Sequence, residues 1–397
     1  MTSINNMTSI NNMDSIFSNF SHGKENNNKF IQFNIDNVDT SIVNSIRRVI
    51  LSEIPQIGFY FDAYDNSDVN VISNSSPIHN EFLAHRISLI PLHCSDDMDV
   101  DELCKYKYII NETNEANQIK TITSQHIQIF DTDNNPVSSN IKETLFPKNT
   151  ILKKKNIDSY ILITSLPPCV NNPTTVHVDA KASYGIQKTS ICYSCVSLCT
   201  FYNIIDEEEL KAKTKTIEDD ISIDGDQKKQ CLGNLNTIEK YKLFHKNVHG
   251  EPNKFRFLIE SECGYTPQYI FLKALQILKD KITKLTTFDP KYITINQNDG
   301  MYHAIIYNES HTIGNLLQAL LFNKYCRTTS NELTYIGYNV QHPLIDNVVL
   351  KLKFKKETDI MEFLKKAFNY VIKQHFDNLI QEWTTFIKDN INGQIVL

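Results

Sequence analysis

The chain has 397 residues, of which 41% are apolar and 22% are charged, a composition ordinary for a soluble protein. Its length predicts two or three domains, and its net charge of −6 argues against a stand-alone nucleic-acid-binding protein. The sequence has no signal-peptide-like start and no apolar run of the roughly 18 residues that a membrane span needs, so no membrane association is expected. Its nine scattered cysteines favour free thiols in a reducing, intracellular compartment.

The N-terminal segment begins "MTSINNMTSINNMDS", a six-residue unit that is repeated and then broken off. It offers few side chains for burial, which predicts a disordered tail over residues 1–28. Alternating polar and apolar residues in "KFIQFNI" then predict the first strand.

A helix is predicted directly after this strand. Asp39, Thr40 and Ser41 are candidate N-caps, and Pro55 ends the helix because the residue before a proline disfavours helical geometry. Its apolar face has i, i+4, i+7 and i+8 spacing and consists of Ile42, Ile46, Val49 and Ile50. The following "QIGFYF" is predicted to be a strand.

Residues 63–205 contain short alternating runs such as "HIQIFD" and "TVHVDAKASYG", which predict an inserted, mainly β domain. Residues 206–251 are rich in charge and poor in large apolar side chains. We therefore expect a charged connector there, exposed or partly disordered.

The second part of the chain repeats the pattern of the first. "HAIIYN" predicts a strand, Ser310 to Thr312 supply a helix cap, and "LTYIGYNV" predicts another strand. The apolar face of this second helix consists of Ile313, Leu316, Leu317, Leu320 and Leu321. The strands "KFRFLIES" and "VVLKLKFK" each precede a further helix, so each half is predicted to run strand–helix–strand, then strand–helix.

The two predicted helices also share a phrase, because "SIVNSIRRVI" and "TIGNLLQALL" place a hydroxyl residue, Ile and Asn at the same spacing. An α+β unit with helices on one face of a small antiparallel sheet leaves an apolar surface that needs a partner. We therefore predict an intrachain pseudo-heterodimer, with a first dimerisation domain at 29–62 and 252–287 and a second at 288–397. Chance similarity between amphipathic helices is the alternative, and the joint recurrence of order, spacing and Asn argues against it.

Metal and catalytic motifs are weak throughout the sequence. Cys192, Cys195 and Cys199 could supply thiolate ligands for zinc, but their apolar surroundings favour buried structural cysteines. "DISIDGD" imitates a calcium loop, yet its twelfth position is Cys231 in place of a glutamate. No phosphate-binding loop or nucleophile motif is present. We expect no metal, no cofactor and no catalytic residue.

Arg47 and Arg48 distinguish the first helix from the second, where the equivalent residues are Gln318 and Ala319. Guanidinium groups suit pairing with carboxylates across a protein interface, so the arginines are candidate partner-binding residues. A solvated helix face is the alternative interpretation.

The motifs carry a family resemblance. "VNSIRRVILSEIP" with "FLAHRISLIPL" resembles the alpha-like subunit of multisubunit RNA polymerases, called D in archaea and the third-largest subunit in polymerase II. "HTIGNLLQALL" with "YIGYNVQHPL" resembles its smaller partner, archaeal L. Those two subunits are normally separate chains, and their fusion resembles the arrangement in large DNA viruses that transcribe in the cytoplasm.

The sequence departs from the family pattern at three places. It has Gln341 where a Pro-His-Pro motif is usual, and Asn80 where an Asp-Glu pair is usual. The segment "HCSDDMDVDELC" also lacks the cysteine-rich metal loop that many members carry.

The resemblance implies a non-catalytic assembly platform of DNA-directed RNA polymerase, a nucleotidyltransferase complex. Its implied partners are the second-largest subunit for the first half, the largest for the second half, and small polymerase subunits, with nucleic acid met only through the complex. It implies that Glu53, His85 and Arg86 lie near the first contact, together with the two arginines. The implied location is the host cytoplasm and virion for a viral protein, or the nucleus for a cellular one. A free-standing scaffold of the same fold is the alternative function.

Overall fold

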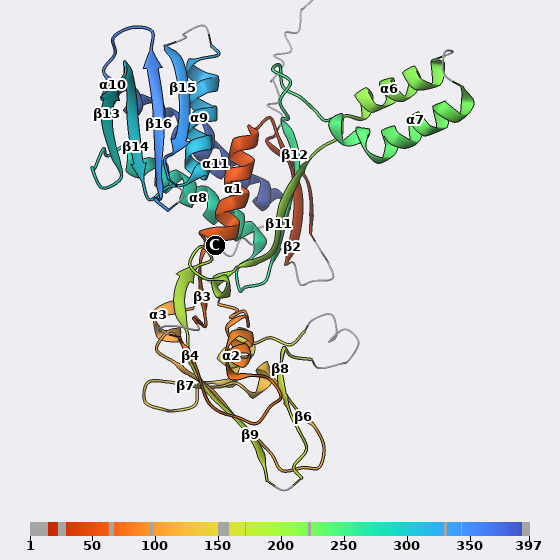
Figure 1. The fold of residues 1–397 in the computed structure, drawn as a ribbon, viewed down its shortest axis with the longest axis vertical. Helices are drawn as coiled ribbons and strands as arrows, with labels where there is room; N and C mark the ends of the chain where they lie inside the picture. The colour runs from red at the N-terminus through yellow and green to blue at the C-terminus, as the bar shows by residue number, and fades with distance from the viewer. Residues whose placement is uncertain are drawn as a thin grey trace, which may run out of the picture.

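The structure is a computed structural model that describes residues 15–22, 29–62, 67–94, 98–149, 159–170, 172–220, 224–328, 332–342 and 344–390. The first half of the chain forms an antiparallel sheet with strand order β1-β2-β12-β11 (Figure 1). These strands are β1 (Phe17–His22), β2 (Phe30–Asp36), β11 (Val196–Asn203) and β12 (Lys254–Ser261). Every second residue of β2 and β12 is buried, so one face of the sheet is turned to the core.

The second half repeats this architecture with the antiparallel order β13-β14-β16-β15. Its strands are β13 (Ile293–Asn298), β14 (Met301–Tyr307), β15 (Leu333–Val340) and β16 (Asn347–Phe354). Because both sheets place corresponding strands in the same order, the predicted α+β pseudo-dimer is confirmed.

Helices pack between the two sheets and join the halves in one core (Figure 1). They are α1 (Thr40–Ser52), α8 (Pro267–Leu285), α9 (His311–Tyr325), α10 (Ile360–Val371), a π-helical turn (Ile372–Asp377) and α11 (Asn378–Asn390). The C-terminal helix α11 reaches the first half, where the Trp383 ring lies 4.6 Å from that of Phe33 and 4.3 Å from that of Phe271, centroid to centroid. The two halves therefore share a single hydrophobic core.

The inserted domain has a separate core, drawn below the paired sheets in Figure 1. Its main sheet has the order β4-β9-β5-β7, and two further strand pairs are β6-β8 and β3-β10. The strands are β3 (Pro55–Gly58), β4 (Val69–Asn74), β5 (Lys107–Asn114), β6 (Lys120–Thr123), β7 (Gln128–Phe130), β8 (Leu162–Leu166), β9 (Thr174–Lys181) and β10 (Ser183–Ile186). Among its described residues, the helices are α2 (Asn80–Ser88), α3 (Val100–Leu103) and α4 (Ser139–Leu145), with 3₁₀ turns at Ser124–His126 and Ile191–Tyr193.

The boundaries of this domain differ from the sequence expectation at both ends. β11, assigned to the insert at 63–205, pairs with β12 and completes the first sheet. Ile57 and Phe59, assigned to the first dimerisation domain, belong to the core of the insert. Alternation predicts that a segment is a strand and which face it buries, but it does not identify the pairing strand.

The N-terminal segment also differs from the sequence expectation. Phe17–His22, assigned to the disordered tail, forms β1, because Phe17 is buried against Phe33 and Trp383. Residues 1–14 and 23–28 of that predicted tail lie outside the described residues.

The charged connector forms a helical hairpin of α6 (Glu207–Asp219) and α7 (Gly225–Thr237), followed by a 3₁₀ turn (Glu239–Lys242). The side chains of Asp206 and Asp224 cap the two helices. Lys, Glu, Gln and Ala favour helix even where an apolar stripe is weak, which explains the difference from the sequence expectation.

In the part of the chain that the structure describes, no helix combines the length and apolar character that crossing a membrane requires.

Candidate subunit interface at the paired helices

Helices α1 and α9 begin at side-chain caps that fix their positions. The Asp39 carboxylate accepts the Ser41 N–H at 2.8 Å, and the Ser310 hydroxyl accepts the Thr312 N–H at 3.4 Å.

The nine residues predicted for the dimer core are all buried in the cluster that spans both halves. They are Ile42, Ile46, Val49, Ile50, Ile313, Leu316, Leu317, Leu320 and Leu321.

Polar bonds between the two helices show that they run antiparallel. Near the end of α1, Arg48 Nε donates to Thr312 Oγ1 at 2.8 Å, at the start of α9. At the opposite end, Asn323 Nδ2 donates to Asp39 Oδ2 at 3.0 Å. Residues late in one helix thus meet residues early in the other, as an approximate two-fold axis requires.

The two arginines differ in exposure and contacts. Arg47 is half-buried, and its Nε and Nη2 donate to Asn44 Oδ1 at 3.1 and 3.0 Å. Arg48 is exposed and donates a hydrogen bond to Thr312 of the second half. Across the described ranges, no carboxylate lies within ion-pair distance of either guanidinium. Two positive charges therefore lie at this helix pair without an ion-paired carboxylate among the described residues.

Glu53, at the end of α1, takes part in an ion-pair cluster within the chain. Its carboxylate lies 2.7 Å from Lys281 Nζ of α8, and the same ammonium lies 2.9 Å from Glu309, which precedes α9. Burial alone would lower the pKa of Lys281, but the two carboxylates outweigh it and raise that pKa. Burial raises the pKa of Glu309, although Lys281 opposes the rise. Through Lys281, the end of α1 is therefore linked to α8 of the first half and to Glu309 of the second half.

His85 and Arg86 lie on α2 of the inserted domain, apart from α1 in the fold (Figure 1). Both side chains are exposed, and Arg86 Nη2 donates to the Leu162 carbonyl at 3.0 Å. Phe82 on the same helix is 68% exposed. The structure therefore places the five predicted partner-binding residues on two surfaces, with α1 on one and α2 on the other.

The position equivalent to Arg47 has a structural role in the second half. Gln318 Oε1 accepts the Tyr338 N–H of β15 at 3.2 Å. The two helices therefore differ in chemistry at this position. α1 carries the cation of Arg47, whereas α9 carries the neutral amide of Gln318, which is already hydrogen-bonded.

An open groove of about 640 Å³ follows the junction of α1 and α9. Asn44, Asn315 and Gln318 line it from both helices, and it is also lined by Arg327, which is paired with Glu251 at 2.7 Å. Sequence reasoning did not identify this groove or the residues that bridge it, because periodicity defines the buried face of a helix and not the crossing point.

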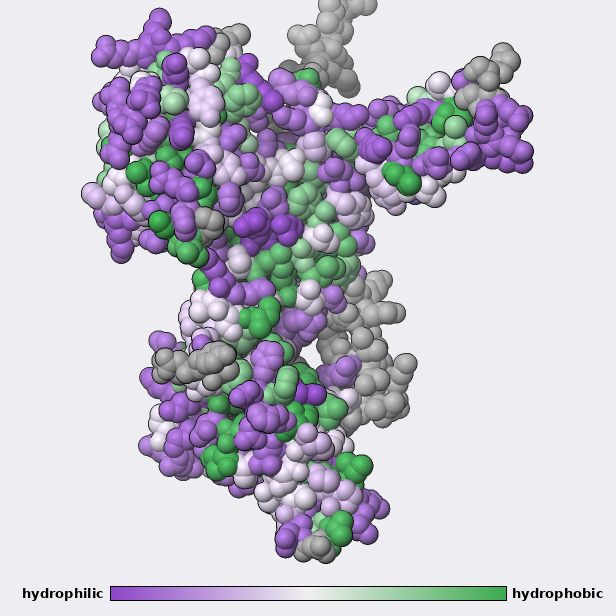
Figure 2. All heavy atoms as spheres, viewed as in Figure 1, coloured by the Kyte–Doolittle hydropathy of each residue, from purple (hydrophilic) through white to green (hydrophobic). Residues whose placement is uncertain are grey.

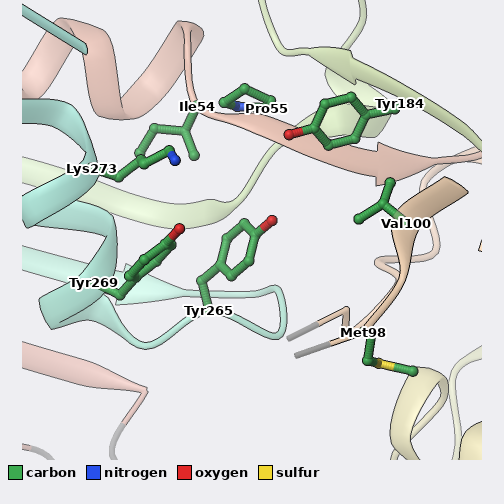
Figure 3. Close-up of a pocket in the computed structure, with 8 residues that line it drawn as sticks. All are labelled: Ile54, Pro55, Met98, Val100, Tyr184, Tyr265, Tyr269 and Lys273. Carbon is green, nitrogen blue, oxygen red and sulfur yellow. The ribbon is translucent and has the colours of Figure 1, made fainter. Parts of the chain in front are cut away.

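A smaller cavity of about 150 Å³ lies where the first half meets the insert (Figure 3). Figure 3 shows aromatic side chains from separate segments turned toward it, and the rings of Tyr265 and Tyr269 lie 5.2 Å apart. The lining residues are Ile54, Pro55, Met98, Val100, Tyr184, Tyr265, Tyr269 and Lys273. Its volume is well below the roughly 300 Å³ at which small-molecule sites begin, so we interpret it as a packing junction.

The three clustered cysteines are buried. Burial raises the pKa of Cys195, and it raises that of Cys199 to about 12. Metals bind the thiolate form, which burial disfavours at these two sites. No disulfide joins any of the nine cysteines, all of which the structure describes. Within the same described residues, no three His, Cys, Asp or Glu side chains are grouped as metal ligands.

Two copies of one α+β unit, packed helix against helix within one chain, define an intrachain dimer. The model of the RNA polymerase Rpb3/Rpb11 dimerisation domain matches residues 32–282, and a second model with the same description matches residues 302–382. The chain belongs to this family of RNA polymerase dimerisation-domain proteins.

Several relatives carry the names of polymerase subunits. The chain is 24% identical over 304 residues to "DNA-directed RNA polymerase II subunit rpb3" of Dictyostelium discoideum, covering 65% of this chain and 90% of that protein. It is 33% identical over 113 residues to "Probable DNA-directed RNA polymerases I and III subunit RPAC2" of Caenorhabditis elegans, covering 28% and 72%. It is 32% identical over 123 residues to "DNA-directed RNA polymerase subunit Rpo3" of Picrophilus torridus, covering 27% and 44%.

Proposed function

We propose that this chain is a non-catalytic assembly-platform subunit of a multisubunit DNA-directed RNA polymerase, docking the two largest subunits. Its family and its polymerase relatives support the subunit role. One observation carries the docking role, namely that Arg47 and Arg48 lie at the helix pair without a carboxylate partner in the described chain. A guanidinium in this setting suits a carboxylate on another protein.

The asymmetry of the two halves supports different partners for each. In the proposal, the first half binds the second-largest subunit through Arg47 and Arg48, with His85 and Arg86 extending the contact onto the insert. Glu53 contributes indirectly, because its carboxylate already holds Lys281. The second half, where Gln318 replaces the cation, binds the largest subunit.

The wider setting follows from the same proposal. Small polymerase subunits join the assembly, and nucleic acid is met only through the complex. The protein works inside the cell, in the nucleus of a cellular source or in the cytoplasm of a virus-infected host. Fusion of the two dimerisation units favours the viral arrangement that the sequence resembles.

The arginines provide the test. Arg47→Ala with Arg48→Ala removes no large apolar side chain, so the isolated protein loses about 1 kcal/mol of stability or less. Binding of the purified second-largest subunit weakens by about 2–5 kcal/mol, because its carboxylates lose their partners. Gln318→Ala, at the matching position of α9, is the control and leaves this binding unchanged. Equal binding by the double variant and the wild type would refute the docking role.

A free-standing scaffold is the second candidate function, and a purification separates the two. The tagged protein from its native source co-purifies with two very large polymerase subunits if the proposal holds. A protein recovered without them is a scaffold that has left the polymerase.

A further inference from the structure

The hairpin of α6 and α7 projects from the body of the molecule and packs against neither sheet (Figure 1). Leu235 is the buried residue of the two helices, while Leu210, Ile217 and Leu232 are half-buried between them. Helices of about 12–15 residues are marginal in water without tertiary packing. A projecting pair with so little core is therefore suited to packing against another surface.

The charge of the hairpin limits what that surface can be. Residues 206–237 contain nine acidic and five basic side chains. Near the tip, Glu218, Asp219, Asp224 and Asp226 are exposed. This excess of negative charge opposes nucleic acid, an anionic membrane and a second copy of a chain whose own net charge is −6. It favours a protein surface rich in Lys and Arg.

An open groove of about 700 Å³ lies at the base of the hairpin. Figure 2 shows apolar side chains at the surface where the hairpin joins the body. Tyr202 and Tyr241 line the groove and are 56% and 64% exposed, and the neighbouring Ile238 is 63% exposed. Exposed apolar area bordered by charge is typical of a protein–protein contact.

We propose that the hairpin and this groove together form a docking arm for another subunit of the same polymerase. The partner contributes a basic segment that lies along the acidic helices, with an apolar side chain in the groove beside Tyr241. This inference rests on the proposed function, since it takes the partner from the polymerase. It concerns a surface separate from the arginines of α1 and from α2.

Crosslinking in the assembled polymerase tests the contact. A photo-crosslinking amino acid replaces Tyr241, and in a control it replaces Ile119, which is 68% exposed on the inserted domain. The Tyr241 probe is expected to crosslink to one polymerase subunit that the Ile119 probe does not label. A polymerase that assembles normally and yields no subunit crosslink from Tyr241 overturns the docking arm.

Reversing acidic charges on the hairpin tests whether the contact with the partner is electrostatic. Glu218→Lys with Asp219→Lys changes the last turn of α6, where the helix dipole favours cations, so the helix is retained. The Tyr241 crosslink yield at low salt is expected to fall by about tenfold, and by less at high salt, because charges steer this contact. Glu115→Lys with Glu357→Lys changes two exposed acids outside the hairpin and leaves the yield unchanged.

The outcomes separate this inference from the proposed function. An unchanged crosslink after reversal on the hairpin overturns the electrostatic contact while leaving the polymerase role intact. A wild-type chain that joins no polymerase refutes the proposed function, and the docking arm with it.

Discussion

Gly314 of α9 packs tightly against strands β15 and β16 of its sheet. A Cβ at this position would be 2.6 Å from the ring of Tyr338 and 2.9 Å from Cγ1 of Val348. In the first half the equivalent residue is Val43, which is fully buried. The side chain at this position, a hydrogen in α9 and a buried isopropyl group in α1, therefore distinguishes the packing of the two copies.

Gly314→Ala is predicted to destabilise the protein by about 1–3 kcal/mol, because two well-packed side chains must move. Gly233→Ala is the matched control, since the corresponding Cβ in α7 has no neighbour within 4 Å. The control should be neutral or stabilise by up to about 1 kcal/mol, because Ala favours helix over Gly. Urea unfolding measures both, and a Gly314 variant as stable as the control would contradict the close packing.

His93 carries a second prediction at the residue scale. Its Nδ1 lies 3.4 Å from Lys29 Nζ, and burial together with this ammonium lowers the pKa of His93 from 6.5 to about 4. Between these pH values the unfolded chain binds a proton that the folded chain does not. The stability contributed by neutral His93 is complete above pH 6.5 and is lost as the pH falls toward 4.

The free energy of unfolding should therefore decrease from pH 6.5 to 4.5 in the wild type. In His93→Gln, which stays neutral, the decrease over the same interval should be smaller. Urea unfolding at a series of pH values measures the difference. Parallel curves for the two proteins would show that folding does not lower the pKa of His93.

At the scale of elements, the cluster of Glu53, Lys281 and Glu309 joins α1, α8 and the start of α9. The three side chains are 15–19% exposed. Lys281→Met leaves two half-buried carboxylates without a cation and should cost about 2 kcal/mol of stability. Adding Glu53→Gln and Glu309→Gln should recover most of this loss, because no uncompensated charge then remains. Thermal melts of both variants measure the recovery, and its absence would indicate that the loss does not come from the unpaired carboxylates.

The sequence predicts the helices and strands better than it predicts the contacts between them. The apolar faces of α1 and α9 follow from 3.6-residue periodicity, which depends on the local sequence alone. The pairing of β11 with β12 and the bond from Arg48 to Thr312 depend on residues far apart in the chain, so no local pattern contains them. The arginines could be identified from the comparison of the two copies, whereas Lys281 and Glu309 had no signal of that kind.

For the whole molecule, the shared core predicts that the halves remain associated when their covalent link is removed. A cut near Phe288, between α8 and β13, leaves the contacts of Trp383 with Phe33 and Phe271 in place. The two fragments should elute together from a sizing column at micromolar concentration. Fragments that separate would show that the linker, and not the core, holds the halves.

The covalent link between the halves also determines how the dimer behaves at low abundance. Two separate chains dissociate on dilution, whereas a tethered partner stays at an effective concentration of about millimolar. Ribosomes deliver both halves in equal number, and each first half meets its own second half before it meets another molecule. Gene dosage and subunit balance, which limit assembly from separate chains, therefore do not limit this step.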